Sequence, residues 1–285
     1  MRYARVLRTL GMTVSCHPEQ SEGSQYRIDM TEKQFNKWFS TILMTLMVIV
    51  IAITTAFKLQ QPDARVAMLL IAAFGSVMGV ASSVLSANGI IWTFVFGILD
   101  VVFCCIVAAD NGIWGNFGLH LFYFLPMQFV GIWQWRKRGA KGAKTEVQAR
   151  RFTGKQWLIT VVSVLAGLAL VYFILLQIKL HTVEEVDRMQ VFFDAAVTTF
   201  NIAGQILMSL AFYEQWYLWI LVNISSILLW GNTMLASAAS SYTVVMFIKY
   251  CFYLVNSVNG LRIWYSLSRD PHKHEGVQSH GAGCC

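Results

Sequence analysis

The sequence predicts an all-α integral membrane protein with eight transmembrane helices. Hydrophobic residues make up 56% of the 285 residues and charged residues only 13%, whereas a soluble globular chain carries about a quarter charged residues. The charges are also clustered, so that long stretches of the chain contain none. A chain of this composition cannot cover itself with a polar surface, and we expect much of its surface to face lipid.

Eight stretches are long and apolar enough to cross a hydrocarbon core of roughly 30 Å, which takes about 20 residues of helix. Each should be a helix, because a backbone in lipid has to satisfy its own hydrogen bonds. Residues 216–248 contain no charged residue, so the last two spans are separated at the small, polar stretch 231–242. The predicted spans are 38–57, 66–87, 91–109, 119–135, 156–178, 191–212, 216–235 and 242–264.

Spans two to four (66–135) resemble spans six to eight (191–265), and the single linking span 156–178 lies between them. Three spans followed by one crossing give both units the same orientation, which makes a parallel 3+1+3 repeat of the kind found in transporters. Chance similarity between apolar helices is the alternative. The first span, 38–57, lies outside the repeat and is predicted to be an accessory helix. The matched pairs are Gly79 with Gly204, Trp92 with Trp219, Gly131 with Gly260, and Trp135 with Trp264.

The formal net charge of +7 comes from Lys and Arg in the connections between spans. The basic loop 136–155 and both termini fall on one side of the membrane, and few basic residues fall on the other. The positive-inside bias therefore places both termini in the cytoplasm. The basic residues of the sparse side are Lys58, Arg65, Lys179 and Arg188.

The two ends of the chain are polar. Residues 1–37 form a polar N-terminal extension without the apolar core of a signal peptide, and Met30 is a plausible alternative start. Residues 266–285 are predicted to be a disordered tail. The cysteines show no metal-ligand spacing, and the chain contains no P-loop, zincin or nucleophile-elbow motif. We therefore expect no metal, no cofactor, no enzymatic activity and no nucleic-acid partner.

Polar side chains inside the spans are the candidate site residues, because burying them in lipid costs free energy unless they have a function or a partner. Most belong to the second unit. The alternative is that they form hydrogen bonds between helices. Asp100 lies in mid-span, where it could pair with Lys249, carry a proton or meet a cationic ligand. The candidates are Asn201, Gln205, Trp216, Trp219, Asn223, Tyr253, Asn256 and Asn259, with Gln128 and Asp100 from the first unit.

These side chains favour a flat solute that is rich in hydroxyl or amide groups. Indole and phenol rings stack on an aromatic ring and attract cations, and carboxamides offer both donors and acceptors. Arg and Lys are nearly absent from the spans, so a phosphate would lack its usual partner. The sequence therefore predicts an unphosphorylated solute.

The same residues resemble the PnuC family of bacterial nicotinamide riboside transporters. The resemblance covers about 66–268 and depends on Asn201-x-x-x-Gln205, Trp216-x-x-Trp219, Asn223 and the closing stretch 256–264. It implies a fold akin to the SWEET sugar transporters, a central riboside site, assembly as a trimer and a place in the bacterial cytoplasmic membrane. It also implies facilitated diffusion, made one-way by a cytoplasmic kinase.

The sequence is also compatible with functions other than facilitated diffusion of nicotinamide riboside. Related family members carry riboflavin or thiamine. An ion-coupled symporter could use Asp100, and a membrane receptor or enzyme would bind its ligand without transport. The extra first span also departs from a minimal seven-span core, which leaves its role open.

Overall fold

The computed structural model describes residues 18–62, 65–110, 114–142, 145–182, 186–236 and 241–269. These residues are helical apart from short connections, and they contain isolated β-bridges but no strand. The chain divides into two compact units, 1–42 and 43–285, and the second holds all the packing described below. The helices are α2 (Pro18–Leu59), α3 (Val66–Ala87), α4 (Thr93–Asp110), α5 (Trp114–Leu119), η1 (His120–Phe124), α6 (Leu125–Lys137), α7 (Gly154–Thr182), α8 (Arg188–Ser209), α9 (Gln215–Ala236) and α10 (Ser241–Leu267).

The helix boundaries follow the apolar pattern closely in α3 and α4. Helix α2 begins at Pro18, inside the stretch expected to be a polar extension, while residues 1–17 and most of the predicted tail lie outside the described part. Five described helices are long and apolar enough to cross a membrane: α2, α3, α4, α7 and α8. The all-α prediction is therefore confirmed, and the number of spans remains a prediction.

The fourth predicted span is not one regular helix. It consists of α5, the π-helical turn η1 and α6, and the Leu125 N–H donates to the His120 carbonyl oxygen, one residue further back than in an α-helix. Pro126 stands in the first turn of α6 and has no N–H to continue the ladder. A π-turn next to a proline adjusts the backbone register, and such turns are frequent at functional sites.

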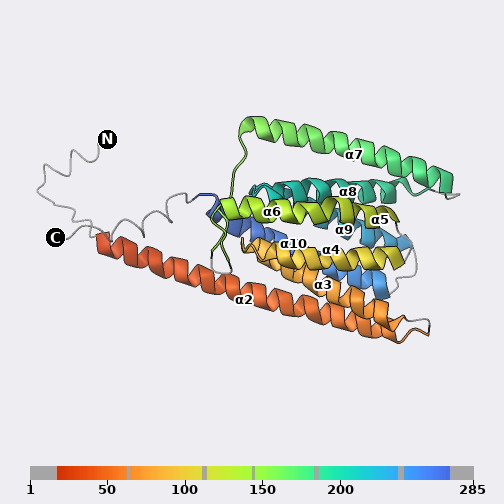
Figure 1. The fold of residues 1–285 in the computed structure, drawn as a ribbon, viewed down its shortest axis with the longest axis horizontal. Coiled ribbons are helices and arrows are strands. Elements are labelled where there is room, and N and C mark those ends of the chain that lie inside the picture. Colours follow the sequence, from red (N-terminus) through yellow and green to blue (C-terminus); the bar gives the residue numbers. More distant parts are fainter. Residues whose placement is uncertain are drawn as a thin grey trace, which may run out of the picture. The chain divides into compact units, whose positions relative to one another are not determined.

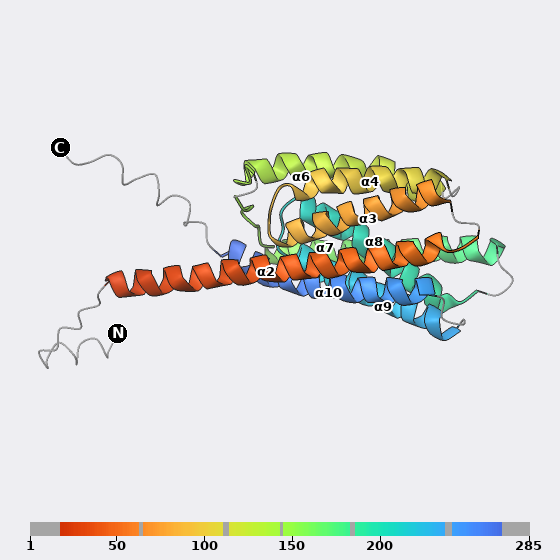
Figure 2. The same cartoon turned by 90° about the horizontal axis from the view of Figure 1, so that it is seen from below.

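Six helices of the compact unit 43–285 close into a ring. In order of packing, α3 contacts α4, α4 contacts α6, α6 contacts α8, α8 contacts α9, α9 contacts α10, and α10 returns to α3. Helix α7 packs against α8 outside this ring, as Figure 1 shows, and Figure 2 shows α4 beside α6 and α9 beside α10. The exposed faces carry large apolar side chains such as Phe74 and Phe129 in the ring and Leu165 in α7, so the ring and α7 present lipid-compatible surfaces outward.

The connection between α6 and α7 (residues 138–153), here called the strap, joins two turns of the ring. The Val147 N–H donates to the Gly89 carbonyl oxygen in the α3–α4 turn (2.9 Å). The Arg150 N–H donates to the Ala211 carbonyl oxygen in the α8–α9 turn (2.7 Å), and the Tyr213 N–H donates back to Arg150 (2.9 Å). Gly89 and Ala211 both have left-handed φ values, 68° and 58°. The strap therefore ties the α3–α4 turn and the α8–α9 turn together through backbone hydrogen bonds.

Glu214, at the end of the α8–α9 turn, binds the strap through its side chain. Its Oε1 accepts a hydrogen bond from the Phe152 N–H (2.8 Å), while its Oε2 is buried without a hydrogen-bond partner among the described residues. The side chain is only 5% exposed. Burial raises the pKa of this carboxyl above its ordinary value.

The buried Glu214 predicts that folding stability falls as the pH rises. The folded protein keeps the Glu214 proton to a higher pH than the unfolded chain does, so the contribution is greatest below the unfolded pKa and is lost as the pH rises through the folded one. Melting curves from pH 4 to 8 should show Glu214→Gln gaining stability relative to wild type as the pH rises. The exposed Glu146→Gln is the control, and a Glu214→Gln difference that is constant with pH would contradict the prediction.

An aromatic cluster fills the ring at the strap end. It is built on Phe94, Trp135, Trp216 and Trp264, none more than 2% exposed. The Trp135 indole donates to the Met208 carbonyl oxygen at the end of α8 (2.8 Å), and the Trp264 indole donates to the Ser86 carbonyl oxygen at the end of α3 (2.9 Å). Both carbonyls belong to a last helical turn, whose carbonyls lack intrahelical partners. Each also accepts a backbone N–H of the following turn, Ser86 from Gly89 and Met208 from Ala211 (both 3.0 Å). The Trp135 indole thus ties α6 to α8, and the Trp264 indole ties α10 to α3.

Trp264→Phe should lower the free energy of unfolding by about 1–2 kcal/mol, because a buried carbonyl loses a hydrogen bond while the ring is largely kept. Trp135→Phe should have a similar effect, since its indole makes the corresponding bond. Thermal melts in one detergent would measure both. Trp133→Phe is the matched control, because Trp133 is 56% exposed on the outer face. Equal melting temperatures for all three variants would refute the tie.

Candidate functional site

A cavity of about 620 Å³ lies inside the ring, and every helix of the ring contributes to its wall. Pockets of this size suit small organic molecules. At the strap end its lining includes Ser86, Met208 and Trp216, next to the aromatic cluster. Its lining extends through Ala72 and Met246 toward the other end of α3 and α10. The cavity therefore runs along much of the ring axis.

The structure brings most of the predicted site residues to this cavity but not all of them. Asn256 and Asn259 are not in its lining. The Asn256 amide donates to the Ser83 side chain (2.9 Å) across the seam between α10 and α3, and Asn259 accepts from Arg262 (3.1 Å). Asn256 therefore joins α10 to α3, whereas Asn259 bonds within its own helix and its Nδ2 has no hydrogen-bond partner among the described residues. The predicted residues that line the cavity are Asp100, Gln128, Asn201, Gln205, Trp216, Trp219, Asn223 and Tyr253.

The carboxamides of α8 and α9 are held in place by single hydrogen bonds. Gln205 Nε2 donates to the Ser209 hydroxyl (3.3 Å), and Asn223 Nδ2 donates to the Ser257 hydroxyl of α10 (2.9 Å). Asn201 Nδ2 donates to the Val197 carbonyl oxygen one turn back in its own helix (2.8 Å). A carboxamide held at its nitrogen keeps a fixed orientation and can still offer its oxygen as an acceptor.

Three polar atoms of the lining are buried and have no hydrogen-bond partner among the described residues. They are Gln128 Oε1, Trp216 Nε1 and Ser86 Oγ. Buried polar groups nearly always have partners, and the exceptions require an explanation. None of the three atoms is exposed to the cavity in this conformation, so a solute would reach them only after the side chains around them move.

Two indole rings line the cavity, and each packs closely against a glycine of a neighbouring helix. A Cβ on Gly204 would lie 3.3 Å from the Trp219 ring, and a Cβ on Gly260 would lie 2.5 Å from the Trp216 ring. Trp216 is 2% exposed and contacts Trp264, with 6.2 Å between the ring centroids. Trp216 is therefore a fixed part of the strap-end floor, and Trp219 supplies an aromatic wall.

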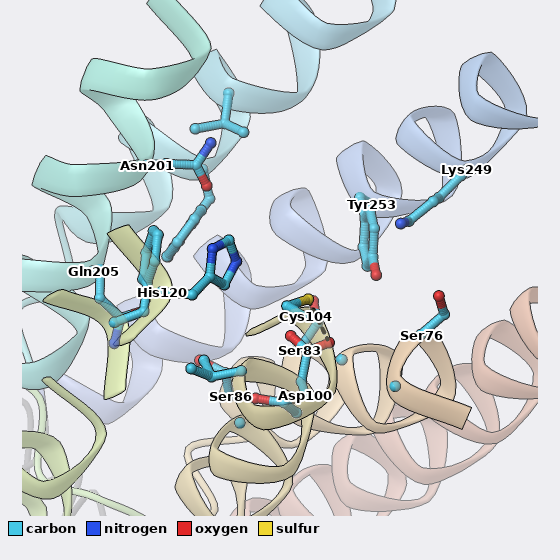
Figure 3. Close-up of a pocket in the computed structure, with 18 of the residues that line it drawn as sticks. Ser76, Ser83, Ser86, Asp100, Cys104, His120, Asn201, Gln205, Lys249 and Tyr253 are labelled. Carbon is cyan, nitrogen blue, oxygen red and sulfur yellow. Dashed lines mark hydrogen bonds between the residues drawn. The ribbon is translucent and has the colours of Figure 1, made fainter. Parts of the chain in front are cut away.

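Sequence reasoning missed the contribution of α3. Ser76, Gly79, Ser83 and Ser86 all line the cavity, and their spacing of three and four residues places them on one helical face. This stripe of small residues was readable in the sequence. Figure 3 shows Ser83 and Ser86 on one wall and Asn201 and Gln205 on another. Lys249, considered in the sequence only as a possible partner of Asp100, also lines the cavity. The other missed lining residues with polar or reactive side chains are Ser82, Cys104, His120, Tyr250 and Ser257.

A ring of apolar helices, several of them long enough to cross a membrane, around a cavity with polar side chains in its wall is typical of a multi-pass membrane transporter. Among the described residues, no group of three His, Cys, Asp or Glu could hold a metal ion. The chain belongs to the nicotinamide mononucleotide transporter family, whose model matches residues 69–266. It is accordingly a transporter and not an enzyme, and the predicted resemblance is confirmed.

Three similar proteins carry related names. The nicotinamide riboside transporter PnuC of Neisseria mucosa is 31% identical over 209 residues, which cover 72% of this chain and 74% of that protein. The protein of the same name from Haemophilus influenzae is 28% identical and covers 73% and 82%. The crystal structure of the vitamin B3 transporter PnuC matches with a TM-score of 0.59 at 28% identity, over 80% of this chain and 91% of the other.

Proposed function

We propose that this protein carries nicotinamide riboside across the bacterial cytoplasmic membrane by facilitated diffusion, and that phosphorylation by a cytoplasmic kinase traps the riboside. The observation that carries the proposal is the cavity inside the helix ring, with its anchored carboxamides and its indole wall. The riboside combines a flat ring, a primary amide and ribose hydroxyls. Each of these groups has a complementary partner in the lining.

The charges of the lining favour the riboside over the mononucleotide that gives the family its name. A phosphate usually meets Arg or several donors. Among the described residues of the lining there is no Arg, and Lys249 is accompanied by the carboxylate of Asp100. Nicotinamide riboside carries no phosphate. We therefore assign Gln205, Asn223 and Gln128 to its hydroxyl and amide groups, and Trp219 to its ring.

We further infer an eight-span protein built on a 3+1+3 parallel repeat, with the strap and both termini in the cytoplasm. Support comes from α3 and α8, which have the same length of 22 residues. The turn after α3 also resembles the turn after α8. An alignment of the two segments at these turns places Phe94 opposite Trp216. Gly131 packs on the Phe94 ring as Gly260 packs on the Trp216 ring. The turns favour aligning Gly204 with Ser82, three residues from the Gly79 match read from the sequence.

Transport would proceed by alternating access between the two three-helix units. The seams α6–α8 and α10–α3 are where these units meet, and the aromatic cluster closes the strap end. Opening that end requires the Trp135 and Trp264 ties to loosen. Assembly as a trimer is part of the proposal because the family resemblance implies it, and the mass of the particle in native nanodiscs tests it.

Uptake of labelled nicotinamide riboside into sealed proteoliposomes tests the proposed function. Without any ion gradient, the internal concentration should rise to the external one and stop there, and excess unlabelled riboside should compete. Nicotinamide mononucleotide, riboflavin and thiamine should compete poorly. Absence of saturable flux despite ligand binding would identify a receptor instead.

Asp100 in the cavity wall supports a second candidate, an ion-coupled symporter. That candidate predicts accumulation above the external concentration when a proton or sodium gradient is imposed. The same vesicles, loaded to give each gradient in turn, separate the two functions.

A further inference from the structure

Two opposite charges lie in the wall of the cavity. Asp100 comes from α4 and Lys249 from α10, and they are close enough to interact electrostatically. In Figure 3 Asp100 lies beside Cys104, and Lys249 lies beside Tyr253. Charges within a membrane-spanning bundle are costly and usually mark a functional pathway.

The Asp100 carboxylate is placed by its own surroundings. A Cβ on Gly79 would lie 2.9 Å from Asp100 Oδ1, so the carboxylate packs directly against α3 at a residue that leaves room for it. The Cys104 thiol donates to the same oxygen at 3.8 Å. A thiol is a weak donor, so the carboxylate keeps most of its demand for a positive partner.

Lys249 supplies part of the positive charge near Asp100 and also lies near an aromatic ring. Its ammonium lies 5.6 Å from the centroid of the Tyr253 ring, which is within the range of a cation–π interaction. Both Asp100 and Tyr253 line the cavity. A carboxylate and a phenol ring in one cavity wall, both within electrostatic reach of this ammonium, are the surroundings that an aromatic cation would also prefer.

Nicotinamide riboside is such a cation, because its ring nitrogen is a pyridinium. We propose that Asp100 and Tyr253 form a subsite for this positively charged ring, and that Lys249 is a tethered cation that competes with the solute for it. The inference rests on the proposed function and deepens it. The subsite makes charge, and not only shape, a criterion of selection. Lys249 limits affinity, which a carrier needs in order to release its solute.

Binding of nicotinamide riboside is compared with binding of its dihydro form, which keeps the amide and ribose but has a neutral ring. Calorimetry uses the purified full-length protein at pH 7.5. Wild type should prefer the cation, and Asp100→Asn should reduce this preference by roughly tenfold, the size of one ion pair in a partly polar setting. Lys249→Met should increase affinity for the cation about threefold or more, and leave the dihydro form unchanged.

Asp194→Asn is the matched control, because Asp194 lies in α8 but does not line the cavity, and its preference should equal that of wild type. An unchanged preference in Asp100→Asn, or weaker cation binding in Lys249→Met, would overturn the subsite. If Asp100→Asn does not fold, the Lys249→Met result decides alone. Wild-type binding of both forms without preference rejects the subsite and leaves the proposed function intact, whereas no binding of either form rejects both.

Discussion

Gly260→Ala should lower the free energy of unfolding by about 1–3 kcal/mol, as overpacking of a closed core does. The new Cβ would lie 2.5 Å from the Trp216 ring, closer than real carbon contacts come. The ring cannot easily move away, because Trp216 is 2% exposed and packs against Trp264. Gly131→Ala should act in the same way, since its Cβ would strike the Phe94 ring. Thermal melts in detergent measure both effects.

The control is a second glycine within a helix. A Cβ on Gly231 in α9 would meet Phe247 at 3.7 Å, an ordinary van der Waals contact. Gly231→Ala should therefore leave the melting temperature unchanged or raise it, because alanine favours a helix by about 1 kcal/mol over glycine. If Gly260→Ala and Gly231→Ala have the same melting temperature, Gly260 does not pack tightly against the Trp216 ring.

Asn223→Ala should reduce the rate of riboside uptake by roughly tenfold to a hundredfold, because it removes hydrogen bonds worth about 1.5–3 kcal/mol in total. The variant loses an acceptor in the cavity and also releases Ser257, which Asn223 holds at 2.9 Å. Gln205→Ala should have an effect of similar size for the same reason. Initial rates in proteoliposomes at several riboside concentrations would show whether apparent affinity falls.

Asn232→Ala is the matched control for Asn223. Asn232 lies on the same helix, is absent from the cavity lining and bonds Asp187 near the start of α8 (3.2 Å). Its replacement should leave uptake unchanged. Wild-type rates in both Asn223→Ala and Gln205→Ala would mean that the solute crosses elsewhere, and the site assignment would be wrong.

Hydropathy and span length were sufficient to predict most of the helices, because lipid leaves the backbone few alternatives. The same pattern could not predict which way each helix faces. Asn223 and Asn256 look equivalent in sequence, yet one lines the cavity and the other bonds Ser83 across a seam. The difference arises from the rotation of α9 and α10 about their axes, which depends on packing against neighbouring helices.

The strap and the α3 serines mark two further limits of the sequence. Basic composition identified residues 136–155 as a loop, but the backbone hydrogen bonds to Gly89 and Ala211 join residues far apart in the chain and have no local signal. The serine stripe on α3 did have a signal, since its spacing is helical. It was missed because serine in an apolar helix is most often a packing residue.

A density map of the protein with nicotinamide riboside bound would test the proposed solute site. Density for the solute is expected inside the six-helix ring, in contact with Trp219, Gln205 and Asn223. Density outside the ring, or a ring interior closed by side chains in the presence of saturating riboside, would contradict it.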